Sequence, residues 1–272
     1  MVESKITSLQ NIKVKQVVAL QQKSAERRKQ GVFVVEGLRE LIHCQEAGYQ
    51  IETLFICPSL MNASTLPSSL SDVTTFEVTP EVYEKIAYRG GTEGTMAIVR
   101  SRILRLKDLK LKENPLLMVL ESVEKPGNLG AILRSADAAG ADAVLVCDPL
   151  TDLYNPNLIR SSIGAIFNVP CVACSTEECI SFLKTKGIRI LTAQLQDSTL
   201  YYDTDMTVGT AIIMGTESTG LTNVWREAAD AHIRIPMLGR LDSLNVSVSA
   251  AILLYEAVRQ RMMVDPINSP FI

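Results

Sequence analysis

Residues 116–147 of the chain are LLMVLESVEKPGNLGAILRSADAAGADAVLVC. An apolar run covers Leu116–Leu120, and a helical pattern of apolar residues covers Gly130–Ala139. Gly140 ends that helix, and a second apolar run covers Ala143–Cys147. Two apolar strands that flank a helix are typical of a βαβ unit, whose strands lie parallel in a sheet covered on both faces.

Units of the same kind continue toward the carboxyl terminus. The sequence predicts further strands at residues 169–173, 188–193, 211–214 and 233–235, and helices that start at Pro156 and cover 176–186, 223–230 and 246–262. This alternation predicts an α/β domain with a parallel sheet over residues 115–272.

The first hundred residues predict a second, smaller α/β domain. Strands are expected at residues 32–35, 51–56, 73–78 and 95–99, and helices at 8–22, from Gly37 to the residue before Gly48, and from Pro80 behind an N-cap at Thr79. Residues 101–114 are rich in charge and form the expected linker between residues 1–100 and the larger domain.

The composition is that of a globular protein, with 47% apolar residues and a mean hydropathy of +0.16. No apolar stretch approaches the roughly 18 residues that cross a bilayer. Residues 1–5 lack the apolar core of a secretion signal. We therefore expect a cytoplasmic protein that has no membrane partner.

Charge is distributed unevenly along the chain. Residues 1–112 contain 16 Lys and Arg against 12 Asp and Glu, whereas residues 113–272 contain 11 against 18. The basic runs Lys23–Lys29 and Arg100–Lys112 are candidate surfaces for a polyanion. A solvated helix face or a linker is the alternative explanation for each run.

The six cysteines do not predict a metal site. Cys171 and Cys174 form a Cys-x-x-Cys pair with Cys179 nearby, in a segment typical of a short buried strand where Cys acts as a small apolar residue. A zinc site needs a second pair or suitably spaced His, and His43 and His232 stand alone. We expect free thiols and no metal.

Three polar loops follow predicted strands, at the sheet edge where parallel sheets bind ligands. They are Glu121–Arg134, Met214–Leu221 and Ile235–Ser247. Each loop alone is also typical of a glycine turn or a helix cap. A nucleotide-dependent oxidoreductase is the first alternative to consider, but the Gly-x-Gly-x-x-Gly fingerprint that it predicts is missing.

Taken together, the loops resemble a known family in order and spacing. Asn128-x-Gly-x-x-x-Arg134, Gly215-x-Glu217-x-x-Gly220 and Ile235-Pro-Met with Ser243-Leu-Asn-Val-Ser are similar to the three motifs of the SpoU (TrmH) family of RNA ribose 2′-O-methyltransferases, in the SPOUT superfamily. Val34–Leu41 resembles the ribosomal-protein-like substrate-binding domain that many members carry. Ser218 is a departure, because the family usually has Gly there.

The resemblance implies a trefoil knot in the carboxyl-terminal domain, S-adenosylmethionine as cofactor, and a homodimer with its active sites at the subunit interface. The implied substrate is RNA, either ribosomal or transfer. The residues that match the catalytic set are Asn128, Arg134, Glu217, Ser243 and Asn245. The residues that match cofactor-contacting positions are Gly215, Ile235 and Leu244.

These residue types suit the reaction. Transfer of a methyl group to a ribose hydroxyl requires alignment of the reactants and removal of one proton, and neither step needs a metal. Arg134 either orients the hydroxyl and a neighbouring phosphate or accepts the proton, which an Arg pKa above about 12 makes demanding. A knotted RNA-binding protein without catalysis is the alternative, and it predicts loss of Asn128, Arg134 or Asn245, all of which are present.

Overall fold

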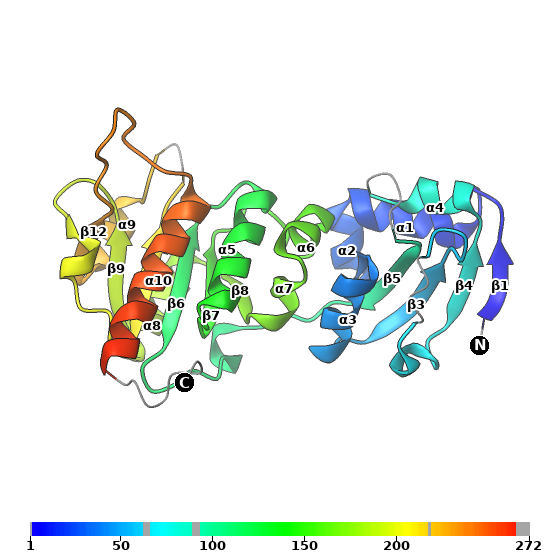
Figure 1. Ribbon diagram of the computed structural model, residues 1–272, viewed down its shortest axis with the longest axis horizontal. Helices are drawn as coiled ribbons and strands as arrows, with labels where there is room; N and C mark the ends of the chain where they lie inside the picture. The colour runs from blue at the N-terminus through cyan, green and yellow to red at the C-terminus, as the bar shows by residue number, and fades with distance from the viewer. Residues whose placement is uncertain (1, 62–65, 89–92, 217–218, 265–272) are drawn as a thin grey trace. The chain divides into compact units, whose positions relative to one another are not determined.

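The computed structural model describes residues 2–61, 66–88, 93–216 and 219–264 (Figure 1). The chain divides into two compact units. Unit 1 consists of Met1–Arg102 together with Asp152–Asn168, and unit 2 consists of Ile103–Thr151 together with Val169–Ile272. In the described part of the chain, no helix is both long and apolar enough to span a membrane.

Unit 2 is built on a seven-stranded sheet in the order β10-β12-β9-β11-β6-β7-β8. Every neighbouring pair in it is parallel, which confirms the prediction from the βαβ pattern. The strands are β6 (Leu116–Glu121), β7 (Ala143–Cys147), β8 (Cys171–Cys174), β9 (Arg189–Ala193), β10 (Thr199–Leu200), β11 (Thr210–Met214) and β12 (Ala231–Arg234).

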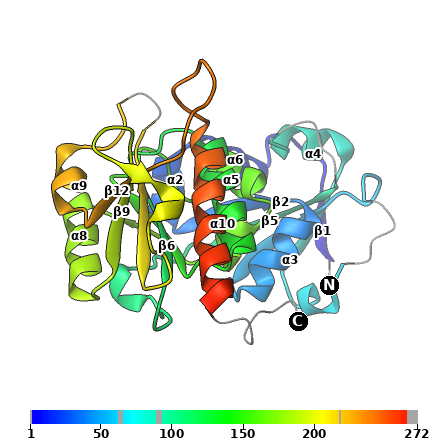
Figure 2. The same cartoon turned by 60° about the vertical axis from the view of Figure 1, so that its left-hand side comes forward.

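Helices cover both faces of this sheet (Figures 1 and 2). The helices are α5 (Pro126–Ala138), α8 (Thr176–Thr185), α9 (Asn223–Ala228) and α10 (Val246–Val264). Cys179 and Leu183 of α8 and Trp225 of α9 join one face of the strands in a single buried cluster. The helices α5 and α10 pack against each other, and α10 contacts β6 and β11.

Part of the expected linker belongs to unit 2. Leu104, Leu106, Leu109 and Leu111 pack against the buried cluster of that unit, with a short 3₁₀ turn at Leu106–Asp108. The charged residues between these leucines hide their spacing in the sequence. The assignment of residues 101–114 as a linker stays a prediction.

Unit 1 contains a five-stranded mixed sheet in the order β1-β4-β3-β5-β2. β5 is antiparallel to both of its neighbours, while β1, β4 and β3 are parallel to one another. The strands are β1 (Val2–Ile6), β2 (Val32–Glu36), β3 (Ile51–Ile56), β4 (Thr75–Val78) and β5 (Thr95–Arg100). The helices are α1 (Ile12–Gln22), α2 (Ser24–Gln30), α3 (Leu38–Glu46), α4 (Pro80–Ile86), α6 (Pro156–Ser162) and α7 (Ala165–Asn168).

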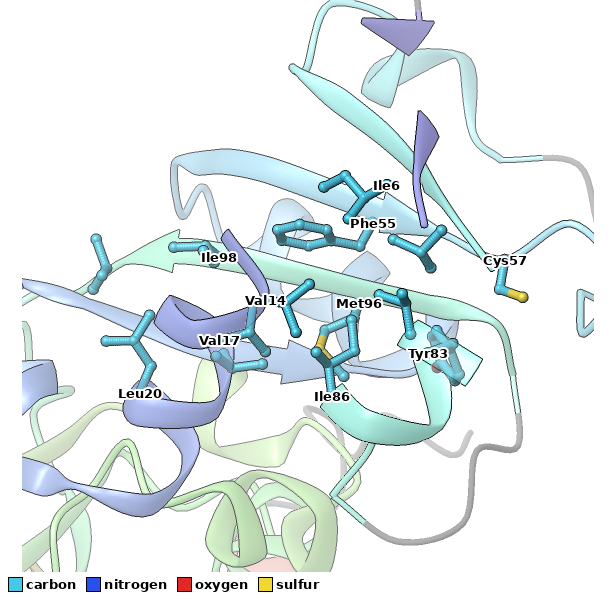
Figure 3. Close-up of a cluster of buried hydrophobic side chains, with 14 residues drawn as sticks. Ile6, Val14, Val17, Leu20, Phe55, Cys57, Tyr83, Ile86, Met96 and Ile98 are labelled. Carbon is cyan, nitrogen blue, oxygen red and sulfur yellow. The ribbon is translucent and has the colours of Figure 1, made fainter. Parts of the chain in front are cut away.

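The core of unit 1 forms where α1 and α4 cover this sheet. Val14 and Val17 of α1 and Ile86 of α4 pack onto Phe55 and Ile98 of the strands (Figure 3). Thr79 caps α4 and Pro80 is its first residue, as the sequence predicts.

The segment Asp152–Asn168 packs within unit 1, although the sequence pattern places it in the larger domain. The ring of Phe33 stacks on that of Tyr154 with centroids 4.2 Å apart, and on that of Phe167 at 6.0 Å. Only its position along the chain assigned this segment to residues 115–272. The stacking of its aromatic rings on Phe33 places it in unit 1 instead. The functional division into residues 1–100 and 115–272 stays a prediction.

Candidate functional site

The three predicted loops begin at the carboxyl ends of β6, β11 and β12, on one edge of the parallel sheet. β6 and β11 are hydrogen-bonded neighbours, so their loops start side by side. β12 lies on the far side of β9 from β11. The fold therefore gathers the first two loops closely and places the third on the same edge.

Asn128 and Asn245 contact each other although 117 residues separate them. The Nδ2 of Asn245 donates to the Oδ1 of Asn128 at 3.3 Å. The Oδ1 of Asn245 accepts from the backbone N–H of Ser247 at 3.0 Å, as an N-cap of α10 does, and from its hydroxyl at 2.6 Å. Capping thus orients the Asn245 amide so that its other end reaches Asn128. The N-cap position of Asn245 is confirmed, and its catalytic role stays a prediction.

The loop after β11 closes on itself around Gly215. Thr216 and Gly220 form an isolated antiparallel bridge, with N–H to O distances of 3.2 and 3.1 Å. A Cβ on Gly215 would lie 2.3 Å from the backbone carbonyl of Gly220, so this close approach requires glycine. Glu217 and Ser218 lie outside the described residues, and the role of Glu217 stays a prediction.

Glu121 is a further site residue, which the sequence analysis treated only as the start of a loop. It is the last residue of β6 and is buried. Its carboxylate accepts from the backbone N–H of Thr222 at 2.9 Å and from the Thr222 hydroxyl at 2.7 Å. Glu121 thus fastens the end of the Gly215–Gly220 loop to β6. An acidic residue directly after a run of apolar strand residues was the available signal.

Arg134 lies in α5, six residues after Asn128, and its side chain is exposed. Among the residues that the structure describes, its guanidinium has no hydrogen bond or ion pair. Its donors are therefore exposed to solvent, as binding of a phosphate or hydroxyl oxygen requires.

The loop after β12 is the most exposed of the three. Ser243 is exposed, and its hydroxyl donates to the neighbouring Asp242 at 3.3 Å. Leu244 is 40% exposed, and Leu238 and Leu241 are 96% and 79% exposed. Apolar side chains presented together in this way favour a surface that a ligand or another chain covers.

An open depression of about 520 Å³ lies beside this loop. Its lining residues are Leu195, Leu200, Arg234, Ile235, Pro236, Met237, Gly239, Arg240, Leu241 and Asp242. Of the three residues predicted to contact the cofactor, Ile235 lines the depression, whereas Gly215 and Leu244 are not among the described residues that do so.

One basic residue of the run Lys23–Lys29 is buried, and the other basic residues are exposed. Arg27 is buried in α2, where it pairs with Asp152 at 2.6 Å and donates to the carbonyl of Leu20. Arg28 and Lys29 are exposed in the same helix. The run as a whole is therefore not a polyanion surface, and only its exposed members remain candidates.

The segment Val34–Leu41 forms the end of β2 and the start of α3 in unit 1. Glu93 accepts from the backbone N–H of Leu38 at 2.9 Å, and Gly37 has a φ of +100°. A Cβ on Gly37 would lie 2.6 Å from the carboxylate of Glu40, so the turn is built for glycine. Burial raises the pKa of Glu36 above its ordinary value.

Comparison with known proteins assigns both parts of the chain. Residues 115–255 match the SpoU rRNA Methylase family, and residues 11–97 match an MRM3-like substrate binding domain. The 23S rRNA (uridine(2479)-2′-O)-methyltransferase of Streptomyces viridochromogenes is 30% identical over 95% of this chain and 93% of its own length. The 23S rRNA (guanosine(2553)-2′-O)-methyltransferase RlmP of Bacillus subtilis is 28% identical over 92% of this chain and 97% of its own.

A solved structure agrees with the sequence comparisons. The AdoMet-bound rRNA methyltransferase from Sinorhizobium meliloti superposes with a TM-score of 0.86 at 30% identity, over 94% of this chain and 97% of that one. The likeness extends over both units, because neither unit alone accounts for that share of the chain.

Proposed function

The chain belongs to the SpoU rRNA methylase family, and on that premise we propose that it methylates one nucleotide of 23S ribosomal RNA. The enzyme transfers the methyl group of S-adenosylmethionine to a ribose 2′-hydroxyl of RNA. Both relatives described above match more than nine tenths of the chain and act on 23S rRNA. That agreement along both units is the observation that favours ribosomal over transfer RNA.

The depression beside Ile235 suits S-adenosylmethionine chemically. The cofactor combines an apolar base face with ribose hydroxyls and charged groups. Leu195 and Leu241 would cover the base, and Arg234 and Asp242 carry charges of both signs for the polar ends. Gly215 and Leu244 would contribute backbone contacts from the neighbouring loops.

The cofactor supplies a methyl group activated by its positively charged sulfur. With the cofactor bound, the methyl group would pass from its sulfur to the 2′-oxygen, and the hydroxyl proton would pass to water. The contact between Asn128 and Asn245 holds two amides at the edge where the three loops begin, and so presents donors and acceptors to the ribose. These amides align the hydroxyl.

Arg134 completes this arrangement as a positioning and charge-stabilising group. A guanidinium keeps its proton at neutral pH, and its planar fork of donors suits a phosphate oxygen next to the reacting ribose. Ser243 lies two residues before Asn245 on the exposed loop and would contact the same nucleotide.

RNA selection belongs to unit 1 in this proposal. The family match for residues 11–97, which lie in unit 1, is a substrate-binding domain. The exposed side chains Arg28 and Lys29 are the candidates for phosphate contacts.

We place the enzyme in the cytoplasm and propose that it is a homodimer. The apolar side chains Ala250, Leu253, Leu254 and Ala257 of α10 are fully buried within one chain, so they do not form the subunit contact. The large apolar side chains that α10 leaves exposed are Val248, Tyr255, Met263 and Val264. A mass of one chain by light scattering at micromolar protein would count against the dimer. The trefoil knot stays a prediction.

The substrate is tested by methyl transfer in vitro. Unmodified 23S rRNA and total tRNA are each incubated with the protein and isotopically labelled S-adenosylmethionine, and modified positions are mapped as alkali-resistant linkages. We expect one 2′-O-methyl position in 23S rRNA. Labelling confined to tRNA would overturn the rRNA proposal, and RNA binding without any transfer would favour a non-catalytic binding protein.

A further inference from the structure

Three cysteine sulfurs gather beside the carboxyl end of the parallel sheet in unit 2. The Sγ atoms of Cys147, Cys174 and Cys179 all lie within 4.8 Å of one another. Cys147 and Cys179 are buried and Cys174 is half-buried. The cluster is separate from the loops assigned to methyl transfer, because it lies on β7, β8 and α8.

The fold itself brings these cysteines together. Cys147 and Cys174 are register partners on the neighbouring parallel strands β7 and β8, with their sulfurs 4.0 Å apart. Successive side chains of a strand point to opposite faces, so both side chains point to the face that α8 covers. Cys179 reaches them from α8. Cys147 and Cys179 belong to one buried cluster, and Cys174 packs against it.

The Cys-x-x-Cys pair in the sequence is therefore not the functional grouping. Cys171 lies three residues before Cys174 on β8, which places it on the opposite face of the sheet. The partner of Cys174 is Cys147, 27 residues earlier in the chain. Cys147 was not grouped with Cys174 and Cys179 in the sequence, because spacing along the chain does not reveal a neighbour on the next strand.

The spacing of the sulfurs matches that of thiolates around one ion. A zinc–sulfur bond of about 2.3 Å places two tetrahedral ligand sulfurs roughly 3.8 Å apart, close to the separation of Cys147 and Cys174. Within the described part of the chain, the group contains these three sulfurs and no His, Asp or Glu atom. Sulfur-only coordination favours a soft ion, and half-buried Cys174 leaves a path for a solvent ligand.

The position of Cys174 also suits a metal-bound thiolate. Cys174 lies directly before Ser175, the N-cap of the ten-residue helix α8, and the amino end of a helix favours negative charge.

We propose that Cys147, Cys174 and Cys179 form a binding site for one thiophilic divalent ion of the zinc class. Binding forms three metal–sulfur bonds and releases the protons of those thiols that are still protonated, with no change of oxidation state. The ion ties β7, β8 and α8 together and takes no part in methyl transfer. The alternatives are a cluster of thiols that serve only as apolar packing, and a Cys147–Cys174 disulfide.

The test uses the full-length reduced protein after removal of bound metal. Zn²⁺ affinity and stoichiometry are measured by competition with a chromophoric chelator, and Co²⁺ reports thiolate ligands by its charge-transfer absorption. We expect one equivalent per chain and a thiolate-to-cobalt band. Cys174→Ser should lower affinity at least roughly tenfold, the lower bound seen even for residues that only support a ligand.

Cys171→Ser is the matched control, because it changes a half-buried cysteine on the same strand but on the other face. It should keep the affinity and the cobalt spectrum of the unsubstituted protein. Circular dichroism checks that both variants fold, and the cobalt spectrum of the unsubstituted protein tests the site independently of any variant. Absence of that band, equal affinities in the two variants, or a Cys147–Cys174 disulfide without metal uptake by reduced protein would overturn the proposal.

Discussion

The sheet of unit 2 runs in one direction throughout, whereas the sheet of unit 1 contains strands of both directions. A parallel sheet sends all of its carboxyl ends to one edge, so loops from distant parts of the chain meet there and can share one ligand. A mixed sheet divides its loops between two edges. This difference supports the proposal that unit 2 surrounds a small cofactor, while unit 1 presents a broad surface to RNA.

The two units also use their polar side chains differently. In unit 1 the buried Arg27 pairs with Asp152, and the buried Glu40 pairs with Arg39. In unit 2 the residues assigned to chemistry, such as Arg134 and Asn245, are exposed. The buried pairs of unit 1 therefore support its scaffold, whereas Arg134 and Asn245, which are proposed to act in methyl transfer, lie at the surface.

The largest effect is expected from Arg27→Met in unit 1. Asp152 would lose its partner in a largely buried position, which lowers the free energy of unfolding by about 3 kcal/mol. Arg28→Met is the matched control on the same helix and should change it by less than about 0.5 kcal/mol. Trp225, the single Trp, lies in unit 2, so urea unfolding followed by both circular dichroism and Trp fluorescence separates the units. Equal stability of the two variants would show that the pair is not part of the scaffold.

Arg134→Ala should remove most of the turnover and leave the fold intact. Groups that position reactants or move protons typically contribute a factor of roughly 100 or more, which is about 2.7 kcal/mol of transition-state stabilisation. Arg134→Lys should recover only part of the rate, because an ammonium lacks the planar fork. Calorimetry should find S-adenosylmethionine affinity unchanged in both variants. A full recovery by Lys would mean that charge alone matters at this position.

Glu121→Gln should weaken cofactor binding by loosening the loop that begins at Gly215. The amide oxygen of Gln cannot replace both carboxylate oxygens that accept from Thr222, and an unsatisfied buried donor costs about 1–3 kcal/mol. Glu124→Gln, an exposed acid in the same loop, is the control. Calorimetric affinities that do not distinguish Glu121→Gln from Glu124→Gln would remove Glu121 from the site.

The smallest effect is expected from reversing charge on α2. The double variant Arg28→Glu/Lys29→Glu should weaken RNA binding several-fold. It should also make the slope of log affinity against log salt concentration shallower by about 0.7–0.9 for each phosphate that these side chains neutralise in the unsubstituted enzyme. Lys184→Glu/Lys186→Glu places the same charge change on exposed positions of unit 2. If filter binding gives the same slope of log affinity against log salt concentration for both double variants, α2 does not contact RNA.

Local sequence patterns predicted the bounds of helices and strands better than they predicted which of these elements pack together. The strands at Ile51–Ile56 and Ala143–Cys147 have the predicted bounds, because each is rich in apolar residues and follows a glycine turn signal. The strand β1 and the helix α2 were not predicted, since both consist largely of polar residues that become part of the fold only through contacts with the rest of unit 1.

The sequence motifs predicted candidate site residues but not the contacts between them. Asn128 and Asn245 were chosen by motif, and their hydrogen bond depends on how the chain crosses the sheet. The tie from Glu121 to Thr222 spans 101 residues, and the pairing of Cys147 with Cys174 depends on strand register. Sequence spacing carries none of this information, because register and strand order arise from the whole fold.

The division of work between the units is tested most directly by single-turnover methyl transfer to 23S rRNA over a range of RNA concentrations. The unsubstituted enzyme, Arg134→Ala and Arg28→Glu/Lys29→Glu are compared in one assay. We predict that Arg134→Ala lowers the rate at saturating RNA at least about 100-fold and keeps the half-saturating RNA concentration. We predict that the α2 double variant keeps the saturating rate and raises the half-saturating concentration. The opposite assignment, with the saturating rate abolished in the α2 variant and retained in Arg134→Ala, would contradict the account.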